Sequence, residues 1–250
     1  IYELLQEAGS VTVVELSQRF GVSEETIRRD LAKMETGGLL QKTYGGAFIN
    51  RGMHREVPIS LRQHTYVEGK NTIGELAADL ISNGDTIFLD ASTTALHVGQ
   101  SIIGKHNLIV ISNALAVSYR LAEAPDIKMI TIGGTLRRTS LTNVGRAAED
   151  SIVRYYADKT FFSCDGVDRD HGITDANEKE AEVRKAMLSQ SKQRILVADH
   201  TKFDRTSFVL IDDFENVDTV ITDRPVSEEW MRFFQNKNIE YISCVEEAGE

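Results

Sequence analysis

Long apolar runs are missing from this chain of 250 residues, and no stretch of 18 or more apolar residues occurs. The sequence therefore predicts no helix that spans a membrane. The start, Ile1-Tyr2-Glu3-Leu4, lacks the basic and then apolar layout of a signal peptide. Both absences favour a cytoplasmic protein. Because the chain has no initiator Met and begins inside an apolar helical pattern, we expect further residues before Ile1.

Cysteine is scarce, and metal-ligand spacing is missing. The six histidines are scattered and no cysteine is paired with them, so we expect neither a bound metal nor a cofactor. Cys164 and Cys244, the two cysteines, lie in apolar runs that resemble strands. We interpret them as reduced core thiols of a cytoplasmic protein.

A surplus of basic residues is also absent: 28 Lys and Arg stand against 38 Asp and Glu, a net charge of −10. This sign is unfavourable for binding nucleic acid, but the charge is unevenly distributed. Residues 1–70 contain nine basic and nine acidic residues, whereas residues 71–250 contain 19 and 29. The acidic surplus therefore belongs to the second part. The first part is neutral, and a local basic face there can still attract DNA.

The first 50 residues show the pattern of three short helices and a hairpin. Residues 11–13 are expected to form a short extended link, and Ser23 is a good N-cap for the third helix. Residues 39–48 predict two short strands around a turn, which we call the wing. The helices are predicted to end at three glycine positions: Gly9, Gly21 and Gly37-Gly38. This spacing is typical of a winged helix-turn-helix.

The third helix carries the strongest functional signal. A helix that enters the major groove presents short polar groups in its first turn and cations slightly further along, where they reach a guanine edge or a phosphate. One alternative, a surface helix with solvated arginines, is disfavoured by the preceding helix, the Gly21-Val22 turn and the wing. The predicted DNA contacts are Thr12, Ser23, Glu25, Thr26, Arg28, Arg29, Lys42 and Tyr44.

From about residue 70 the pattern changes to strands that alternate with helices. The predicted strands are Thr86–Leu89, Leu108–Ile111, Met129–Ile132, Thr160–Ser163, Ile195–Ala198, Thr219–Ile221 and Glu240–Ser243. The predicted helices are Ile73–Ile81, Thr94–Ile103, Ala114–Ala122, Arg146–Tyr156 and Lys179–Ser189. This alternation predicts an α/β fold with an open, mostly parallel sheet. We expect a winged helix-turn-helix domain over 1–50, a linker with a short helical piece over 51–69, and an α/β domain over 70–250.

Polar residues follow the predicted strands. Asp90 ends the first strand, and the run Ser92-Thr93-Thr94 opens the next helix. Hydroxyl groups at a helix N-terminus beside a strand end favour an anion such as phosphate, although ordinary capping is the alternative. Asn113 and Gly133-Gly134 follow the next two strands, and ends of parallel strands converge on one crevice.

Two further candidates follow later strands. Asp165, before Gly166, can accept hydrogen bonds from sugar hydroxyls, and Lys202 can neutralise a phosphate. The alternatives are a simple turn at Asp165-Gly166 and a solvated loop cation at Lys202. The acidic run at 177–182 is either a plain helix start or a lid over the site. Trp230, Phe233 and Phe234 lie at helical spacing and are interpreted as core or as a subunit contact.

The chain resembles the DeoR family of bacterial regulators. The resemblance rests on Val11-Thr12-Val13-Val14-Glu15-Leu16, on Thr26-Ile27-Arg28-Arg29-Asp30-Leu31 and on Tyr44-Gly45-Gly46-Ala47, and it extends over the whole chain. One departure is that the basic residues which usually open the first helix are absent. The second domain resembles the family's effector domain, similar in fold to ribose-5-phosphate isomerase and CoA-transferase-like enzymes.

The resemblance implies a sugar-phosphate inducer bound by Ser92-Thr93-Thr94, Asn113, the Gly133-Gly134 loop, Asp165-Gly166 and Lys202, and it favours Glu178 as well. It also implies a homo-oligomer, dimer or tetramer, on repeated operator half-sites. We therefore predict a repressor of a carbohydrate-utilisation operon that a phosphorylated sugar releases from double-stranded operator DNA. The alternative is an isomerase-like enzyme with an accessory DNA-binding module, in which Asp90, Asp165 or Asp199 would supply a base. An enzyme has little use for a fused recognition helix, so we expect no catalysis.

Overall fold

The computed structural model describes residues 1–36, 39–48, 57 and 59–244. Its contacts divide the chain into two compact units, Ile1–Val67 and Glu68–Glu250. Each unit is described by itself. Two expectations lie outside the described residues: the end of the third helix at Gly37-Gly38, and the greater part of the linker's first half, residues 51–56 and 58.

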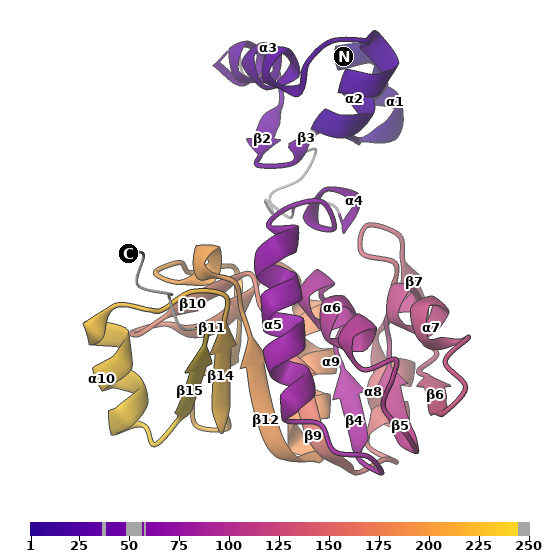
Figure 1. The fold of residues 1–250 in the computed structure, drawn as a ribbon, viewed down its shortest axis with the longest axis vertical. Helices are drawn as coiled ribbons and strands as arrows, with labels where there is room; N and C mark the ends of the chain where they lie inside the picture. The colour runs from indigo at the N-terminus through magenta and orange to yellow at the C-terminus, as the bar shows by residue number, and fades with distance from the viewer. Residues whose placement is uncertain (37–38, 49–56, 58, 245–250) are drawn as a thin grey trace. The chain divides into compact units, whose positions relative to one another are not determined.

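The first unit contains helices around a small antiparallel sheet of strand order β1-β3-β2 (Figure 1). Its elements are α1 (Tyr2–Ala8), β1 (Ser10–Thr12), α2 (Val13–Phe20), α3 (Glu24–Thr36), β2 (Gln41–Thr43), β3 (Gly46–Phe48) and α4 (Ile59–Arg62). Gly9 and Gly21 end α1 and α2 in the left-handed region, with φ of 77° and 64°, where glycine has no steric penalty. Leu5, Leu16 and Leu31 are fully buried at the centre of this unit.

The segment expected to be a short extended link forms a strand of the sheet. β1 pairs with β3, with Val11 opposite Ala47 and Thr12 opposite Gly46. A β-carbon on Gly46 would lie 2.0 Å from the Val11 carbonyl oxygen, so this close approach of two backbones requires glycine. The predicted wing is therefore part of a three-stranded sheet.

The second unit is built on a seven-stranded sheet of order β15-β14-β12-β9-β4-β5-β6 in which every neighbouring pair is parallel. The strands are β4 (Thr86–Leu89), β5 (Leu108–Ser112), β6 (Ile127–Thr131), β9 (Ala157–Phe162), β12 (Ser191–Val197), β14 (Thr219–Thr222) and β15 (Glu240–Ser243). All seven predicted strands are thus present, and the predicted α/β class is confirmed. From the centre of the sheet, β4, β5 and β6 follow one another in chain order to one edge. The strands β9, β12, β14 and β15 follow one another in chain order to the opposite edge.

Helices cover both faces of this sheet. α5 (Val67–Asp79), α6 (Thr93–Ser101) and α7 (Leu115–Leu121) bury one face together with Leu89 and Val110. The other face, with Phe88 and Leu196, packs against α8 (Arg146–Ile152), α9 (Glu178–Ser189) and α10 (Glu228–Asn236). The sheet is therefore a middle layer, as apolar strands buried on both sides require.

Several boundaries differ from the predictions. α5 begins six residues before Ile73, the position expected from the apolar spacing, and α8 ends at Ile152 instead of Tyr156. Four residues then connect α8 to β9, which begins at Ala157. Trp230 and Phe234 of α10 are buried and Phe233 packs beside them, which confirms the core interpretation of these aromatic residues.

Smaller elements surround the sheet edge where the parallel strands end. β7 (Thr135–Arg137) and β8 (Thr142–Val144) form a hairpin, and β10 (Gly166–Asp168), β11 (Gly172–Asp175) and β13 (Val209–Asp212) form an antiparallel sheet. A short 3₁₀ helix covers His200–Lys202. None of these was predicted: the hairpin and the 3₁₀ helix are mostly polar, whereas the apolar run of β13 was overlooked. They supply several of the side chains described next.

Candidate DNA-binding surface and effector site

The first turn of α3 presents short polar groups to solvent. The Ser23 hydroxyl accepts a hydrogen bond from the Thr26 backbone N–H at 3.3 Å and lies 2.9 Å from the Thr26 hydroxyl. Glu25, Thr26 and Arg29 are exposed on this helix. The predicted first-turn residues therefore share an accessible surface, as major-groove contacts require.

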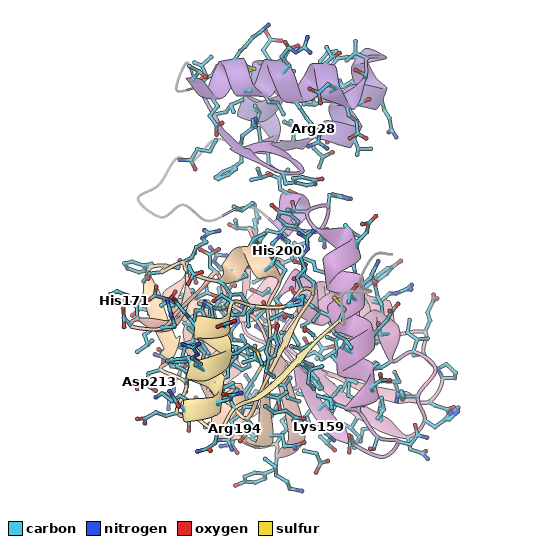
Figure 2. All side chains as sticks on the ribbon, turned by 60° about the vertical axis from the view of Figure 1, so that its left-hand side comes forward. Arg28, Lys159, His171, Arg194, His200 and Asp213 are labelled. Atoms are coloured by element: carbon cyan, nitrogen blue, oxygen red, sulfur yellow. The ribbon has the colours of Figure 1, made fainter. Side chains whose placement is uncertain are left out.

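Arg28 has a different environment from Arg29. Its Nη1 donates to the Tyr44 carbonyl oxygen at 2.5 Å, and its Nη2 lies 3.2 Å from Glu24 Oε2. The guanidinium carbon lies 5.2 Å from the centre of the Tyr44 ring. The side chain is thus turned toward the wing (Figure 2).

The remaining predicted DNA contacts lie on the wing and at the start of α2. Lys42 is exposed on β2, and Tyr44, at the turn between β2 and β3, is 61% exposed. The Tyr44 ring also stacks on Tyr66, with ring centres 5.0 Å apart. Thr12 is the N-cap of α2, and its hydroxyl accepts from the Glu15 N–H at 3.1 Å.

In the second unit, the end of β4 and the start of α6 form a tight turn. Ser92 caps α6 by accepting from the Ala95 N–H at 2.9 Å, and Thr93 and Thr94 are buried in the first turn. The Ser92 N–H in turn donates to Asp90 Oδ1 at 3.0 Å. Ser92 therefore acts as a helix cap, which was the alternative interpretation, and the predicted hydroxyl groups lie together at this turn.

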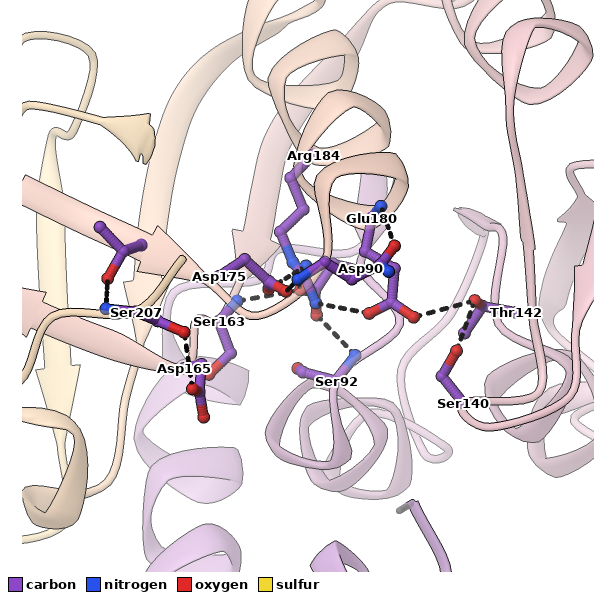
Figure 3. A network of polar contacts seen from close by, with 12 residues as sticks. Asp90, Ser92, Ser140, Thr142, Ser163, Asp165, Asp175, Glu180, Arg184 and Ser207 are labelled. Atoms are coloured by element: carbon purple, nitrogen blue, oxygen red, sulfur yellow. Dashed lines mark hydrogen bonds and ion pairs between the residues drawn. The ribbon is translucent and has the colours of Figure 1, made fainter. Parts of the chain in front are cut away.

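Asp90 anchors a buried network of charged groups (Figure 3). Its Oδ2 accepts from the Ser163 N–H at 3.1 Å and from Nε of Arg184. Arg184 also donates to Asp175 and lies 3.7 Å from Glu180. Burial disfavours the charged guanidinium, but the carboxylates around it, Asp175 foremost, raise the pKa of Arg184. One buried cation therefore holds three carboxylates.

Glu180 connects this network to the β7–β8 hairpin. Its Oε1 accepts from Arg137 Nη1 at 3.0 Å and from the Thr142 hydroxyl at 3.4 Å. Glu178, the residue favoured from the sequence, lies exposed in the first turn of α9, whereas Glu180 is buried. Sequence reasoning missed Glu180 and Arg184, although their i, i+4 spacing suits a helix ion pair.

Asp165 and Lys202 lie near each other, as the converging strand ends predict. Asp165 Oδ2 accepts from the Ser207 hydroxyl at 2.9 Å, and its Oδ1 lies 3.9 Å from Lys202 Nζ. Gly166 begins β10, where a β-carbon would lie 2.5 Å from the Arg205 carbonyl oxygen. Burial raises the pKa of the neighbouring Cys164 thiol, so that cysteine stays protonated and inert.

Asn113, after β5, is 1% exposed. Its Nδ2 donates to the Asn143 carbonyl oxygen at 2.9 Å, while its buried Oδ1 receives no hydrogen bond from the described residues. Gly134, with φ of 151°, packs against β8, where a β-carbon would lie 2.9 Å from the Val144 carbonyl oxygen. Gly133 is exposed.

Two buried basic residues beside α6 were missed from the sequence. His97 of α6 is 8% exposed and Lys70 of α5 is 4% exposed. His97 Nδ1 lies 2.7 Å from Asn71 Oδ1. Burial, and then the charge of Lys70, lower the pKa of His97 to about 4. Sequence reasoning missed them because Lys and His in a helix are usually interpreted as solvated residues.

The ranges that the structure covers contain no group of His, Cys, Asp and Glu arranged to bind a metal ion. None of the helices in these ranges combines the length and the apolar character that a membrane crossing requires.

Comparison with known families agrees with this arrangement. The family model described as a DeoR-like helix-turn-helix domain matches residues 1–52, and the one described as the DeoR C terminal sensor domain matches residues 65–224. The regulator YulB of Bacillus subtilis is 37% identical over 96% of this chain and 92% of its own length. The glycerol-3-phosphate regulon repressor of Escherichia coli is 31% identical over 98% and 96%. The repressor GlcR of Bacillus subtilis is 30% identical over 100% and 96%.

Solved structures give weaker likenesses. Ribose 5-phosphate isomerase A from Neisseria gonorrhoeae has a TM-score of 0.40 at 14% identity, over 54% of this chain and 52% of that one. A translation initiation factor eIF-2B from Pyrococcus horikoshii has a TM-score of 0.44 at 14% identity, over 62% of each chain. The two family matches and the full-length relatives show that the chain belongs to the DeoR family of helix-turn-helix transcriptional regulators.

Proposed function

We propose that the protein represses a carbohydrate-utilisation operon and leaves its operator when a phosphorylated sugar binds the second unit. The observation that carries this proposal is the polar site at the strand ends, on a chain that also has an exposed recognition helix. Relatives described as repressors, one of them of a glycerol-3-phosphate regulon, support the same function.

The start of α6 suits the phosphate group. The free N–H groups of a helix N-terminus and its dipole attract an anion, and the Ser92-Thr93-Thr94 run adds hydroxyl donors. The ammonium of Lys202 can add charge neutralisation, since its ion pair with Asp165 is long at 3.9 Å. We therefore assign the phosphate to this turn.

The sugar hydroxyls have acceptors available nearby. Asn113 Oδ1 is buried without a donor from the described residues, and such a group gains most from a ligand donor. Asp165 can accept a second hydrogen bond beside that from Ser207. We assign both residues to hydroxyl recognition, together with the backbone at Gly133-Gly134.

We propose binding without turnover at this site. An isomerase needs a carboxylate that is free to accept a substrate proton. Asp90 already accepts from two backbone N–H groups and Arg184, and Asp199 accepts from the Thr201 N–H at 3.0 Å. Asp165 accepts from the Ser207 hydroxyl, and we assign its remaining acceptor capacity to a sugar hydroxyl. Conversion of a bound sugar phosphate at ordinary enzymatic rates would contradict this proposal.

We further propose that the regulator acts in the cytoplasm as a homodimer or homotetramer. A helix-turn-helix reads one half-site, and paired half-sites match a symmetric oligomer. This suits a first unit whose basic and acidic residues balance, because one such module has little bulk attraction for DNA. Light scattering of the free protein and of its DNA complex measures both assemblies. A monomer in both would contradict the proposal.

A thermal-shift screen tests the ligand class. A panel of phosphorylated sugars and the same sugars without phosphate is added to the full chain, since a ligand that binds the folded state raises its stability. We expect a shift with one or more sugar phosphates and none with the unphosphorylated partners. Lys202→Ala should reduce that shift, while the exposed control Lys237→Ala should keep it. A shift from the free sugar alone would exclude our phosphate assignment.

A further inference from the structure

The neighbouring arginines of α3 occupy different faces of the helix. Successive residues of an α-helix are rotated by about 100°, so Arg28 and Arg29 leave the helix in different directions. Ile27 and Leu31 of this helix are 1% and 0% exposed and mark its buried face. Arg29 is exposed, whereas Arg28 lies between the exposed and the buried side, beside the wing.

Arg28 uses its guanidinium on the protein itself. Nη1 donates to the Tyr44 carbonyl oxygen, Nη2 pairs with Glu24, and the planar group lies 5.2 Å from the Tyr44 ring centre. The planar guanidinium of arginine can bind two acceptors and an aromatic ring at once, whereas the ammonium of lysine cannot. Tyr44 lies at the tip of the wing, so this contact ties the tip to α3.

A second hydrogen bond joins strand β2 of the wing to the same helix. Glu35 Oε1 accepts from the Lys42 backbone N–H at 2.7 Å. Glu35 follows Arg28 by seven residues, two turns of helix, and therefore lies on the same face. Leu31 lies between them and is buried. Two residues on one face of α3 thus hold the wing, at Lys42 and at Tyr44, by side chain to backbone hydrogen bonds.

From these contacts we propose that Arg28 and Glu35 are positioning residues that set the angle of the wing against α3, and that Arg29, with Thr26, reads the bases. The inference rests on the DNA binding assigned above and adds a division of labour between the two arginines. A wing that is hydrogen-bonded to α3 at Lys42 and Tyr44 presents these two residues at a fixed distance from the groove that α3 enters. Loss of a tie weakens binding to every sequence alike, whereas loss of a reading residue relaxes the preference at one base pair.

The first experiment compares Arg28→Ala with Arg29→Ala. The probe is the duplex that the wild-type full chain selects from a randomised library, together with its single base-pair variants. We expect Arg28→Ala to lose about tenfold in affinity for all of these duplexes alike. Arg29→Ala should reduce discrimination at one base-pair position by about 5- to 150-fold. Hydrogen exchange of the wing amides in the free protein should quicken in Arg28→Ala and stay unchanged in Arg29→Ala.

The second experiment substitutes Glu35, because the proposal and simple electrostatics predict changes of opposite sign in DNA affinity. Removal of a negative charge near DNA should strengthen binding if only electrostatics matters. We expect Glu35→Ala to weaken binding and to speed exchange of the wing amides. Glu35→Gln, which keeps an oxygen that accepts from the Lys42 N–H, should bind like wild type or better.

Two results would overturn the proposal. One is that Arg28→Ala relaxes a single base-pair preference while the wing amides exchange at the wild-type rate. The other is that Glu35→Ala binds as tightly as Glu35→Gln. The Glu35 pair also decides the matter if Arg28→Ala does not fold, and the exchange measurement needs no DNA.

Discussion

At the scale of single residues, Arg184 has the most demanding position in the second unit. Its side chain is 3% exposed and contacts the carboxylates of Asp90 directly after β4, Asp175 of β11 and Glu180 at the start of α9. A buried ion cluster gains little over apolar packing, yet removal of one member leaves uncompensated charge in a medium of low polarity. The cluster therefore makes the position of α9 depend on a single cation.

Arg184→Leu should lower the free energy of unfolding by about 3–5 kcal/mol. Urea titration followed by the fluorescence of Trp230, the single tryptophan, reports on this unit because that residue is buried in its core. Arg232→Ala removes a solvent-exposed pair with Glu228 and should change the value by less than about 1 kcal/mol. If Arg184→Leu lowered the free energy of unfolding no more than this control does, the charged network would not contribute to stability.

His97 makes stability depend on pH. Its folded pKa of about 4 is below the ordinary histidine pKa of 6.5, so between these values the unfolded chain binds the proton more readily. The contribution of His97 is complete above pH 6.5 and is lost as the pH falls toward 4. We expect the wild type to lose about 1–2 kcal/mol more than His97→Gln between pH 7 and pH 5. Equal losses in urea titrations of the two proteins would contradict the buried, neutral state of this side chain.

At the scale of elements, the wing is the most tightly specified part of the first unit. Gly46 lets β3 approach β1, and the Val13 N–H donates to the Gly45 carbonyl oxygen at 2.9 Å. Leu61 of α4 closes over the same place, since a β-carbon on Gly46 would also lie 2.6 Å from its side chain. The packing of β1, of the wing and of α4 therefore depends on the same residue, Gly46.

Gly46→Ala should destabilise the first unit by at least about 1–3 kcal/mol, because backbone atoms cannot move aside as a flexible side chain can. Operator binding should be lost while the Trp230 unfolding transition of the second unit stays in place. Gly104→Ala, where a β-carbon meets nothing within 4 Å, is the matched control. Wild-type DNA binding by Gly46→Ala would contradict the close strand approach.

The parallel sheet was predictable from the sequence, and the elements around the site were not. Strands buried on both faces read as continuous apolar runs, which is why Thr86–Leu89 and Leu108–Ile111 are recognisable without a structure. The hairpin β7–β8 has no such run and takes its shape from contacts with Asn113 and Glu180. Its strands depend on tertiary neighbours that a sequence pattern does not contain.

The same limit applies to the site. Asp90, Ser92 and Lys202 follow strands and can be singled out from that position alone. Arg184 and Glu180 belong to an ordinary polar helix, α9, and only the tertiary fold brings Arg184 to Asp90. In the first unit, the spacing Arg28-Arg29 predicts two cations on a recognition helix. It contains no information on which of them the wing engages.

At the scale of the whole molecule, two units share one chain, and regulation requires that their ligands influence each other. A sugar phosphate that binds the second unit changes operator affinity only if it binds two states of the protein with different affinity. The coupling free energy is reciprocal, so the operator must change the affinity for the sugar phosphate by the same factor. This reciprocity is the central claim of a regulator released by its ligand.

One measurement tests that claim most directly. The sugar phosphate found by thermal shift is titrated into the free protein and into its complex with the selected operator duplex, under identical salt and temperature. We expect the affinity for the sugar phosphate to be lower in the complex, by the factor through which the saturating ligand weakens operator binding. Equal affinities of the free protein and the operator complex would contradict the account.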